Sequence, residues 1–425
     1  MKRTVHQAAR LEGILKVPGD KSISHRALIL GAAARGRQVI DGLSDSRDVL
    51  TTVQALRAMG CFVESMPDGR TIVLPSSLHA EFDIDAGNSG TTARLLAGFG
   101  AARASRCRID GDASLRRRPM GRIAEPLARM GASVVLADGG TLPATIDGGS
   151  LRGIEYTLPV ASAQVKSAIL IAGLFAEGET TVIEPVATRD HTEIMLAAMG
   201  VDVAREGNRI SLHGGSRVEG THVTIPGDIS SAAFFMVAAA IRPGSQLHLP
   251  FTGINPRRTG ILTVLRAMGA DITLEVTHDG CEAACDLTVS AGDLHGIEID
   301  DPAAVASIID EIPVLAVAAT QAEGTTTIRG AGELRHKESD RIEAIVSNLR
   351  AMGARIEAEA DDIVIEGPTP LRGAAVRSFQ DHRMAMAMTI AGLAADGTTE
   401  IDDVDAVEIS YPGFYNDLRS LVRPA

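Results

Sequence analysis

The stretch Pro18–Gly36 combines an apolar helical pattern with polar side chains that could bind an anion. Asp20 is a residue type that commonly caps a helix. Lys21, Ser22 and Arg26 follow it within two turns. A helix N-terminus already carries a partial positive charge, so cations are unfavourable there unless an anion neutralises them. The spacing therefore predicts a helix whose first turn binds a negatively charged ligand.

Other apolar stretches begin in the same way. The stretch "GNSGTTARLL" has a Gly-rich turn at Asn88 and Gly90. This turn is similar to a phosphate cradle but lacks the GK[ST] ending of a P-loop, so ATP is not expected. It could also be an ordinary turn capped by Asn88 or Ser89. Two further starts contain Ser162, Ala163, Gln164 and Lys166, and Asp381, His382 and Arg383.

Arginines gather in the segments that join these stretches. Arginine binds carboxylates and phosphates with two parallel hydrogen bonds, so the clusters indicate substrates with several negative charges. We expect one or two of the four arginines between 116 and 122 to bind substrate. The clusters contain Arg116, Arg117, Arg118 and Arg122, then Arg189 and His191, then Arg257 and Arg258, and finally Arg335, Lys337 and Arg341.

Two acids lie among these cations. Asp310 precedes an apolar stretch, and Glu338 lies within "KESDR". An acid in cationic surroundings is either a structural partner or a proton-transfer group. Asp310 could instead be a helix cap, and Glu338 could instead form a local salt bridge, so both interpretations stay open.

The elements that carry these residues repeat along the chain. Cap-type residues open six Ala-rich stretches, which are predicted to be buried helices. A second series of "RAMG"-like segments predicts amphipathic helices that end at a glycine, followed by a strand. The sequence therefore predicts an α/β fold of six strand–helix–strand–helix–strand repeats. The expected caps are Asp20, Asn88, Ser162, Asp228, Asp310 and Asp381, and the glycines are Gly60, Gly131, Gly200, Gly269 and Gly353.

Three repeats per lobe give a two-lobed protein with pseudo-threefold symmetry in each lobe. One lobe is expected at residues 19–227 and the other at 1–18 plus 228–425. The last repeat lacks its closing strand, which Leu11–Val17 could supply. Both chain crossings read "PGD", a combination suited to a hinge. Equivalent helix starts would face a ligand cleft between the lobes.

The composition indicates which kinds of molecule the protein binds. The net charge is −13 and aromatic residues make up 3%, which argues against nucleic-acid and membrane surfaces. The four cysteines form no CxxC pair, so we expect reduced thiols and no metal site. The N-terminal segment lacks the apolar core of a signal peptide, and the longest apolar run is short for a bilayer. A cytoplasmic enzyme for small molecules is expected, as a monomer.

Eight motifs in order resemble the EPSP synthase family of enolpyruvyl transferases. They are "PGDKSISHRAL", "GNSGTTARLL", "DASLRRRPMGR", "SAQVKSAIL", "TRDHTE", "DEIPVLAVAA", "ELRHKESDRI" and "DHRMAMA". The resemblance implies the two-lobed, six-repeat fold. It also implies transfer of the enolpyruvyl group of phosphoenolpyruvate to the 5-hydroxyl of shikimate 3-phosphate. That reaction releases phosphate through a tetrahedral intermediate, in chorismate and aromatic amino acid biosynthesis, without metal or cofactor.

The resemblance also implies a role for each matching residue. Asp310 would take the hydroxyl proton, and Glu338 or a lysine would protonate the methylene carbon, while Lys21 and the other cations balance the substrate charge. Lys21 would contact both substrates, and Asp310 and Lys337 the ring hydroxyls. Shikimate 3-phosphate would be bound by Lys21, Ser22, Arg26, Ser162, Ala163, Gln164 and Arg189. Phosphoenolpyruvate would be bound by Gly90, Arg118, Arg341 and Arg383, with Asn88 close by.

The chain departs from the family pattern at several positions. Ile409 lies where many relatives have a lysine, Glu333 where some have asparagine, and Ala163 where many have serine. The family is the target of glyphosate, and Gly90 leaves room for that inhibitor, but the response of this chain stays open because Leu95 differs from the usual sensitive pattern. The sister transferase for UDP-N-acetylglucosamine uses a cysteine where this chain has Ala113 and Ser114. A non-catalytic anion-binding scaffold is the remaining alternative.

Overall fold

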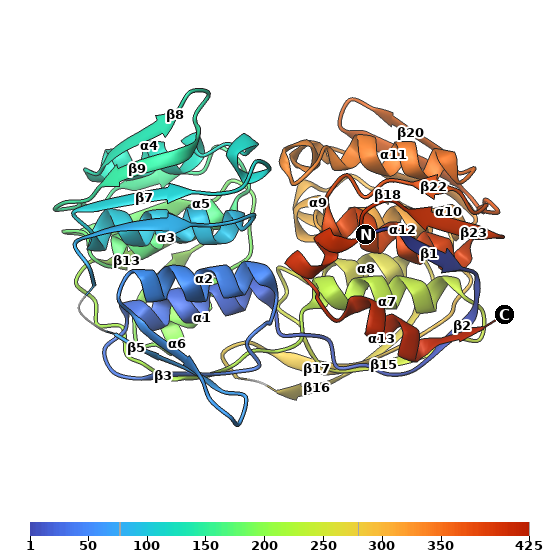
Figure 1. The fold of residues 1–425 in the computed structure, drawn as a ribbon, viewed down its shortest axis with the longest axis horizontal. Coiled ribbons are helices and arrows are strands. Elements are labelled where there is room, and N and C mark those ends of the chain that lie inside the picture. The colour runs from blue at the N-terminus through green and yellow to red at the C-terminus, as the bar shows by residue number, and fades with distance from the viewer. Residues whose placement is uncertain (76–77, 279, 425) are drawn as a thin grey trace. The chain divides into compact units, whose positions relative to one another are not determined.

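A computed structural model describes residues 1–75, 78–278 and 280–424, and the chain divides into two compact units. The N-terminal unit is Gly19–Ile225, coloured blue to green in Figure 1. The C-terminal unit is Met1–Pro18 together with Pro226–Ala425. The chain therefore passes from one unit to the other at Pro18–Gly19 and again at Ile225–Pro226, within the two "PGD" segments.

The N-terminal unit contains three four-stranded sheets, with strand orders β14-β3-β5-β4, β6-β7-β9-β8 and β10-β11-β13-β12. Its strands are β3 (Gln38–Asp41), β4 (Phe62–Ser65), β5 (Thr71–Leu74), β6 (Glu81–Asp85), β7 (Arg106–Asp110), β8 (Ser133–Ala137), β9 (Thr141–Asp147), β10 (Glu155–Thr157), β11 (Glu179–Ile183), β12 (Val203–Glu206), β13 (Arg209–His213) and β14 (His222–Thr224). Its helices are α1 (Lys21–Ala33), α2 (Arg47–Ala58), α3 (Gly90–Arg103), the 3₁₀ helix η1 (Leu115–Arg117), α4 (Gly121–Met130), α5 (Ala163–Gly173) and α6 (His191–Ala198).

The C-terminal unit contains sheets of strand order β16-β17-β15-β2-β24, β18-β19-β21-β20 and β1-β23-β22. Its strands are β1 (Arg3–His6), β2 (Ala8–Ile14), β15 (Gln246–Gly253), β16 (Asp271–His278), β17 (Ala284–Ser290), β18 (Glu298–Ile299), β19 (Gly324–Ile328), β20 (Arg355–Glu359), β21 (Asp362–Gly367), β22 (Ala375–Val376), β23 (Thr398–Ile401) and β24 (Val422–Pro424). Its helices are α7 (Ile229–Ile241), α8 (Gly260–Ala267), α9 (Pro302–Ile308), α10 (Ile312–Gln321), η2 (Gly332–His336), α11 (Arg341–Ala351), α12 (His382–Ala394), η3 (Asp405–Ile409) and α13 (Phe414–Leu421).

The repeat is present, with one strand more than the sequence predicted. In five repeats the second helix is followed by a hairpin of two antiparallel strands, as in β4–β5, β8–β9 and β12–β13. The extra reversal occurs at turn residues such as Gly69 and Gly139, both with positive φ. The expected glycine ends of the second helices are confirmed, because all five glycines have positive φ.

The strand that closes the last repeat is not the expected one. Arg3–His6 closes it, since β1 pairs antiparallel with β23. The expected segment, Leu11–Val17, overlaps β2, which pairs in parallel with β15 of the fourth repeat. Ala8 and Leu11 of β2 are fully buried there. The apolar segment therefore forms a strand as expected, but in the sheet that contains β15. In the N-terminal unit, β14 likewise pairs in parallel with β3 of the first repeat.

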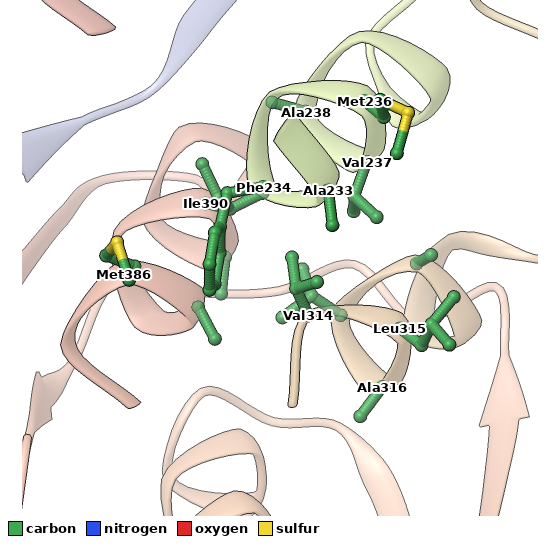
Figure 2. Packing of buried hydrophobic residues seen from close by; sticks show 14 of the residues in the cluster. Ala233, Phe234, Met236, Val237, Ala238, Val314, Leu315, Ala316, Met386 and Ile390 are labelled. Atoms are coloured by element: carbon green, nitrogen blue, oxygen red, sulfur yellow. The ribbon is translucent and has the colours of Figure 1, made fainter. Parts of the chain in front are cut away.

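The inner helices form the core of each unit, as predicted. Figure 2 shows side chains of α7, α10 and α12 pointing toward one another, including Phe234, Val314 and Ile390. In the N-terminal unit α3 packs against α5. A Cβ atom on Gly98 would lie 2.2 Å from the carbonyl oxygen of Ala168, so the glycine permits this close approach. The starts of these helices are thereby held in place.

Within the described residues, no single helix has both the length and the apolar composition needed to cross a membrane. The bent pair Pro302–Ile308 and Ile312–Gln321 meets that test jointly, by length and composition alone, with a bend of 101° between its members.

Candidate active site

The start of α1 holds an ion pair that the sequence analysis did not anticipate. The Asp20 carboxylate accepts a hydrogen bond from the Ile23 amide at 2.9 Å and so caps the helix as predicted. The Lys21 Nζ atom lies 2.9 Å from the Asp48 Oδ2 atom, and the two side chains are 17% and 11% exposed. Asp48 therefore holds the Lys21 ammonium at the helix start while leaving it accessible to a ligand.

Arg26 connects elements inside the N-terminal unit. Its guanidinium is buried and donates hydrogen bonds to Thr192 Oγ1 at 2.8 Å, Ser167 Oγ at 2.8 Å and the Ser22 carbonyl at 2.9 Å. These contacts join α1 to α5 and α6. The structure thus surrounds Arg26 with protein groups, in contrast to the more open Lys21.

A chain of uncharged groups joins α1, α2 and α3. The Nδ1 atom of His25 lies 2.7 Å from the Thr52 hydroxyl, and this hydroxyl lies 2.7 Å from that of Thr92. Thr92 in turn donates to Ser89 Oγ at 2.7 Å. Burial holds the pKa of His25 well below its ordinary value, with smaller contributions from Lys21 and Arg26. The imidazole is therefore neutral and adds no charge to the helix start.

The start of α3 is built around two arginines. Ser89, not Asn88, caps the helix, because its hydroxyl accepts the Thr92 amide at 3.1 Å. The Asn88 amide is engaged elsewhere: its oxygen accepts from Arg118 Nη2 at 2.7 Å, and its nitrogen donates to Asp112 at 2.7 Å. Asn88 thus orients Arg118, which is the buried member of its arginine cluster. Arg116 instead pairs with Asp110 at the surface, and Arg117 is exposed.

Gly90, the first residue of α3, lies beside both guanidinium groups. A Cβ atom at this position would lie 2.7 Å from Arg94 Nη1 and 3.3 Å from Arg118 Nη1. Arg94 also donates to Gln164 Oε1 at 2.8 Å, and Gln164 donates to Thr91 at 2.9 Å. Sequence reasoning missed Arg94, although its position four residues after Gly90 places both on one helix face.

The third helix start, that of α5, is linked to the other two. Ser162 caps α5 as predicted, with its hydroxyl 3.4 Å from the Val165 amide, and Ala163 is the first helical residue. Gln164 joins it to α3 through Arg94. Arg189 is half-buried in the segment just before α6. The N-terminal unit therefore gathers three helix N-termini, cap hydroxyls, amides and cations, which together favour anions.

The C-terminal unit presents a different cluster, centred on Arg341 at the start of α11. Its side chain is 1% exposed and forms ion pairs with Asp381 at 2.8 Å, Glu338 at 2.6 Å and Asp310 at 3.4 Å. Burial alone would lower the pKa of Arg341, but the carboxylates of Asp381, Glu338 and Asp310 outweigh it and raise that pKa. Burial likewise opposes ionisation of Asp381, yet Arg341 holds the pKa of this carboxyl below its usual value.

Asp310 does not cap a helix, contrary to the prediction. The apolar stretch is broken here: α9 has its own cap at Asp301, and Glu311 occupies the N-cap position of α10. The Asp310 carboxylate instead lies 3.2 Å from Lys337 Nζ and 3.4 Å from Arg341 Nη1. The carboxylate, which is 13% exposed, therefore forms ion pairs with two cations instead of capping a helix.

Three further predicted residues lie around Asp310. Lys337 and Glu338 follow η2 and are 29% and 16% exposed. Arg383, in the first turn of α12, donates to the Asp310 carbonyl at 2.9 Å, and its Nη1 atom lies 3.9 Å from Glu311. Asp381 caps α12 as predicted, by accepting the Arg383 amide at 2.8 Å. One cluster thus contains a carboxylate with two cation partners, a second acid, and a third cation.

The start of α7 contains the last predicted cap and one of the two arginines expected near it. Asp228 caps α7 by accepting the Ser230 amide at 2.8 Å, as predicted. Arg258, buried, donates to Asp228 and to the Ser230 hydroxyl, each at 2.9 Å. Arg258 is therefore a structural cation of the C-terminal unit. Among the described residues, no group of three or more His, Cys, Asp or Glu could hold a metal ion.

Comparisons with known proteins agree with the motif pattern. The sequence model of the family described as EPSP synthase (3-phosphoshikimate 1-carboxyvinyltransferase) matches residues 5–418. Curated 3-phosphoshikimate 1-carboxyvinyltransferases of Bacillus cereus and Bacillus thuringiensis are each 48% identical over 97% of both chains. An EPSP synthase structure from Acinetobacter baumannii is 43% identical, with a TM-score of 0.87 over 100% of this chain and 98% of that one.

Proposed function

Because the chain belongs to the EPSP synthase (3-phosphoshikimate 1-carboxyvinyltransferase) family, we infer that it transfers the enolpyruvyl group of phosphoenolpyruvate to the 5-hydroxyl of shikimate 3-phosphate, with release of phosphate. The observation that carries this conclusion is the match over nearly the whole chain to relatives of that name. The reaction belongs to aromatic amino acid biosynthesis. The two charged clusters supply the groups that such a reaction needs.

Shikimate 3-phosphate is assigned to the helix starts of the N-terminal unit. Phosphate binds well at helix N-termini, where amide donors and the helix dipole act together. The start of α5 adds the cap hydroxyl of Ser162, the start of α1 adds the Lys21 ammonium, and Arg189 lies just before α6. The residues assigned to this substrate are Lys21, Ser22, Arg26, Ser162, Ala163, Gln164 and Arg189. Arg26 acts mainly by orienting its neighbours, since protein groups surround its guanidinium.

Phosphoenolpyruvate is assigned to Gly90, Arg118, Arg341 and Arg383, with Asn88 as the residue that orients Arg118. Arg118 lies beside the small Gly90 position, which leaves room for a carboxylate or phosphate at the guanidinium. Lys21 reaches this substrate as well. The proposal requires that residues of both units contact the same pair of substrates during turnover.

Asp310 and Glu338 are assigned to proton transfer. The Asp310 carboxylate lies 3.2 Å from Lys337 and 3.4 Å from Arg341, and as the base it accepts the proton of the 5-hydroxyl. Glu338 is held at 2.6 Å from Arg341. As the acid, Glu338 in its protonated form protonates the methylene carbon. The new C–O bond gives a tetrahedral intermediate, and the reverse proton transfers expel phosphate.

The direct test is phosphate release by the purified chain from phosphoenolpyruvate and shikimate 3-phosphate. We expect turnover with this pair and none when UDP-N-acetylglucosamine replaces shikimate 3-phosphate. An absence of phosphate release with the first pair would overturn the proposal. The scaffold alternative predicts that Asp310→Asn leaves the role of the protein unchanged, so loss of turnover with retained substrate binding would exclude it.

We also propose that the enzyme acts as a monomer in the cytoplasm, with no nucleic-acid or membrane partner. Cys61, Cys107 and Cys285 are reduced thiols, which suits a reducing compartment. Sedimentation equilibrium at several concentrations tests the monomer, and fractionation of cells that produce the chain tests the location.

A further inference from the structure

A buried ion triad lies below the start of α5, apart from the residues assigned to substrate. The Lys166 Nζ atom is 3.0 Å from Glu184 Oε1 and 2.6 Å from Glu193 Oε1. The three side chains are 0%, 1% and 8% exposed, so the lysine cannot touch a substrate. Two carboxylates face one ammonium, an arrangement that apolar side chains of similar volume could often replace without loss of stability. Its presence therefore calls for a role beyond stability.

The triad braces the segment that leads to Arg189. In addition to its ion pair with Lys166, Glu184 Oε1 accepts hydrogen bonds from the Thr188 amide at 3.1 Å and from the Thr188 hydroxyl. Thr188 directly precedes Arg189. The lysine thus holds, through one carboxylate, the backbone next to an arginine assigned to shikimate 3-phosphate.

The second carboxylate braces the helix that follows. Glu193 belongs to the first turn of α6. The neighbouring residues repeat the link, because Ser167 of α5 lies 2.7 Å from the hydroxyl of Thr192 in α6, and Arg26 donates to both. Two consecutive residues of α5 therefore fix the start of α6.

We propose that Lys166 is a positioning residue for shikimate 3-phosphate. It fixes Arg189 and the start of α6 relative to the start of α5, where Ser162 and Gln164 lie. Lys166 belongs to the same turn of α5, because its amide donates to the Ser162 carbonyl at 3.1 Å. This inference rests on the proposed function. Its consequence is a selective one: disturbing the triad weakens the contact with one substrate, shikimate 3-phosphate, more than that with phosphoenolpyruvate.

The test is steady-state kinetics of Lys166→Met and of Lys166→Met combined with Glu193→Gln. The double variant removes one charge of each sign, so it leaves a net charge equal to that of the native triad and keeps the test valid if the single variant folds poorly. A small displacement of a binding group costs about tenfold to 100-fold. We expect KM for shikimate 3-phosphate to rise by that factor in both variants, with KM for phosphoenolpyruvate changed less than about threefold. Lys16→Met, at an exposed lysine, is the matched control and should leave both values unchanged.

Two further readouts separate positioning from simple stabilisation. Glu193→Gln alone keeps a carbonyl acceptor for Lys166 and should largely preserve KM for shikimate 3-phosphate. Amide exchange at Thr188 should accelerate in the double variant, because Glu184 loses the cation that fixes it. Unchanged KM for shikimate 3-phosphate in the folded double variant would overturn the inference, and so would an equal rise in both KM values. The two proposals fail in different ways. If the wild-type chain releases no phosphate, the proposed function is wrong. If the wild-type chain releases phosphate but the variants keep their KM for shikimate 3-phosphate, only the role of Lys166 is wrong.

Discussion

The two units use one repeat to produce helix starts of opposite chemical character. In the N-terminal unit the caps of α3 and α5 are the neutral residues Ser89 and Ser162, with amides and cations around them. In the C-terminal unit the caps of α7 and α12 are Asp228 and Asp381, each paired with a buried arginine. Apart from α1, which Asp20 caps, the inner helices of the N-terminal unit therefore begin without a carboxylate cap, whereas protein carboxylates neutralise the first amides of α7 and α12.

This difference is consistent with the proposal that the acids for proton transfer belong to the C-terminal unit. Burying a carboxylate such as Asp310 costs less free energy where Arg341 and Lys337 lie beside it and balance its charge. In the N-terminal unit, Asp48 lies beside the start of α1 and is paired with Lys21. In the proposed mechanism, one unit thus supplies donors for phosphate, and the other supplies the acid and base.

The strongest test of this contrast is Asp310→Asn. The amide keeps the size of the side chain but cannot accept the hydroxyl proton, and loss of general base catalysis costs about 10²- to 10⁴-fold in turnover. We expect kcat to fall by that factor while binding of shikimate 3-phosphate, measured by calorimetry, changes little. Asp68→Asn, at an exposed surface pair, is the control. Turnover at the wild-type rate would remove Asp310 from the mechanism.

The second test compares arginines from the two units. Arg118→Ala and Arg383→Ala each remove a charge-assisted hydrogen bond, a change that costs on the order of 1.5–3 kcal/mol. We expect KM for phosphoenolpyruvate to rise about tenfold to 100-fold in both, since about 1.4 kcal/mol is a factor of ten. Arg116→Ala, in the same cluster as Arg118 but paired with Asp110 at the surface, should leave it unchanged. If only one of the two variants responds, phosphoenolpyruvate contacts one unit alone.

A smaller effect is expected from Gly90→Ala. The new Cβ atom would lie 2.7 Å from Arg94 Nη1, so this flexible side chain must shift and its hydrogen bond to Gln164 must adjust. We expect a rise of several-fold in KM for phosphoenolpyruvate and little change in thermal stability. Gly121→Ala is a matched control, because Gly121 also opens a helix but a methyl group added there would meet no atom within 4 Å. An unchanged KM would show that the Arg94–Gln164 contact does not influence this substrate.

Sequence reasoning reached the repeat, the burial of the inner helices and most caps, because these follow from local patterns. It failed where a long-range contact decides. The cap role expected for Asp310 gave way to ion pairs with Lys337 and Arg341, which are distant in sequence. The partner of β1 likewise depends on a strand from the other end of the chain. Arg94 was present in a motif, but its link to Gln164 could be seen only once α3 and α5 were packed.

The smallest expected effect concerns the pH dependence of stability in the N-terminal unit. Burial raises the pKa of Glu193 above its ordinary value, although Lys166 opposes the rise. A carboxyl with a raised pKa in the folded state contributes stability that is fully present below its unfolded pKa, near 4.5, and is lost as pH rises through the folded value. Glu193→Gln cannot ionise, so its melting temperature should decline less than that of the wild type as pH is raised from 4 toward neutrality. In the C-terminal unit the sign is opposite, because Arg341 outweighs burial and lowers the pKa of Asp381, whose contribution is lost as pH falls. Parallel melting curves of Glu193→Gln and wild type over this range would show that Lys166 fully compensates the burial of Glu193.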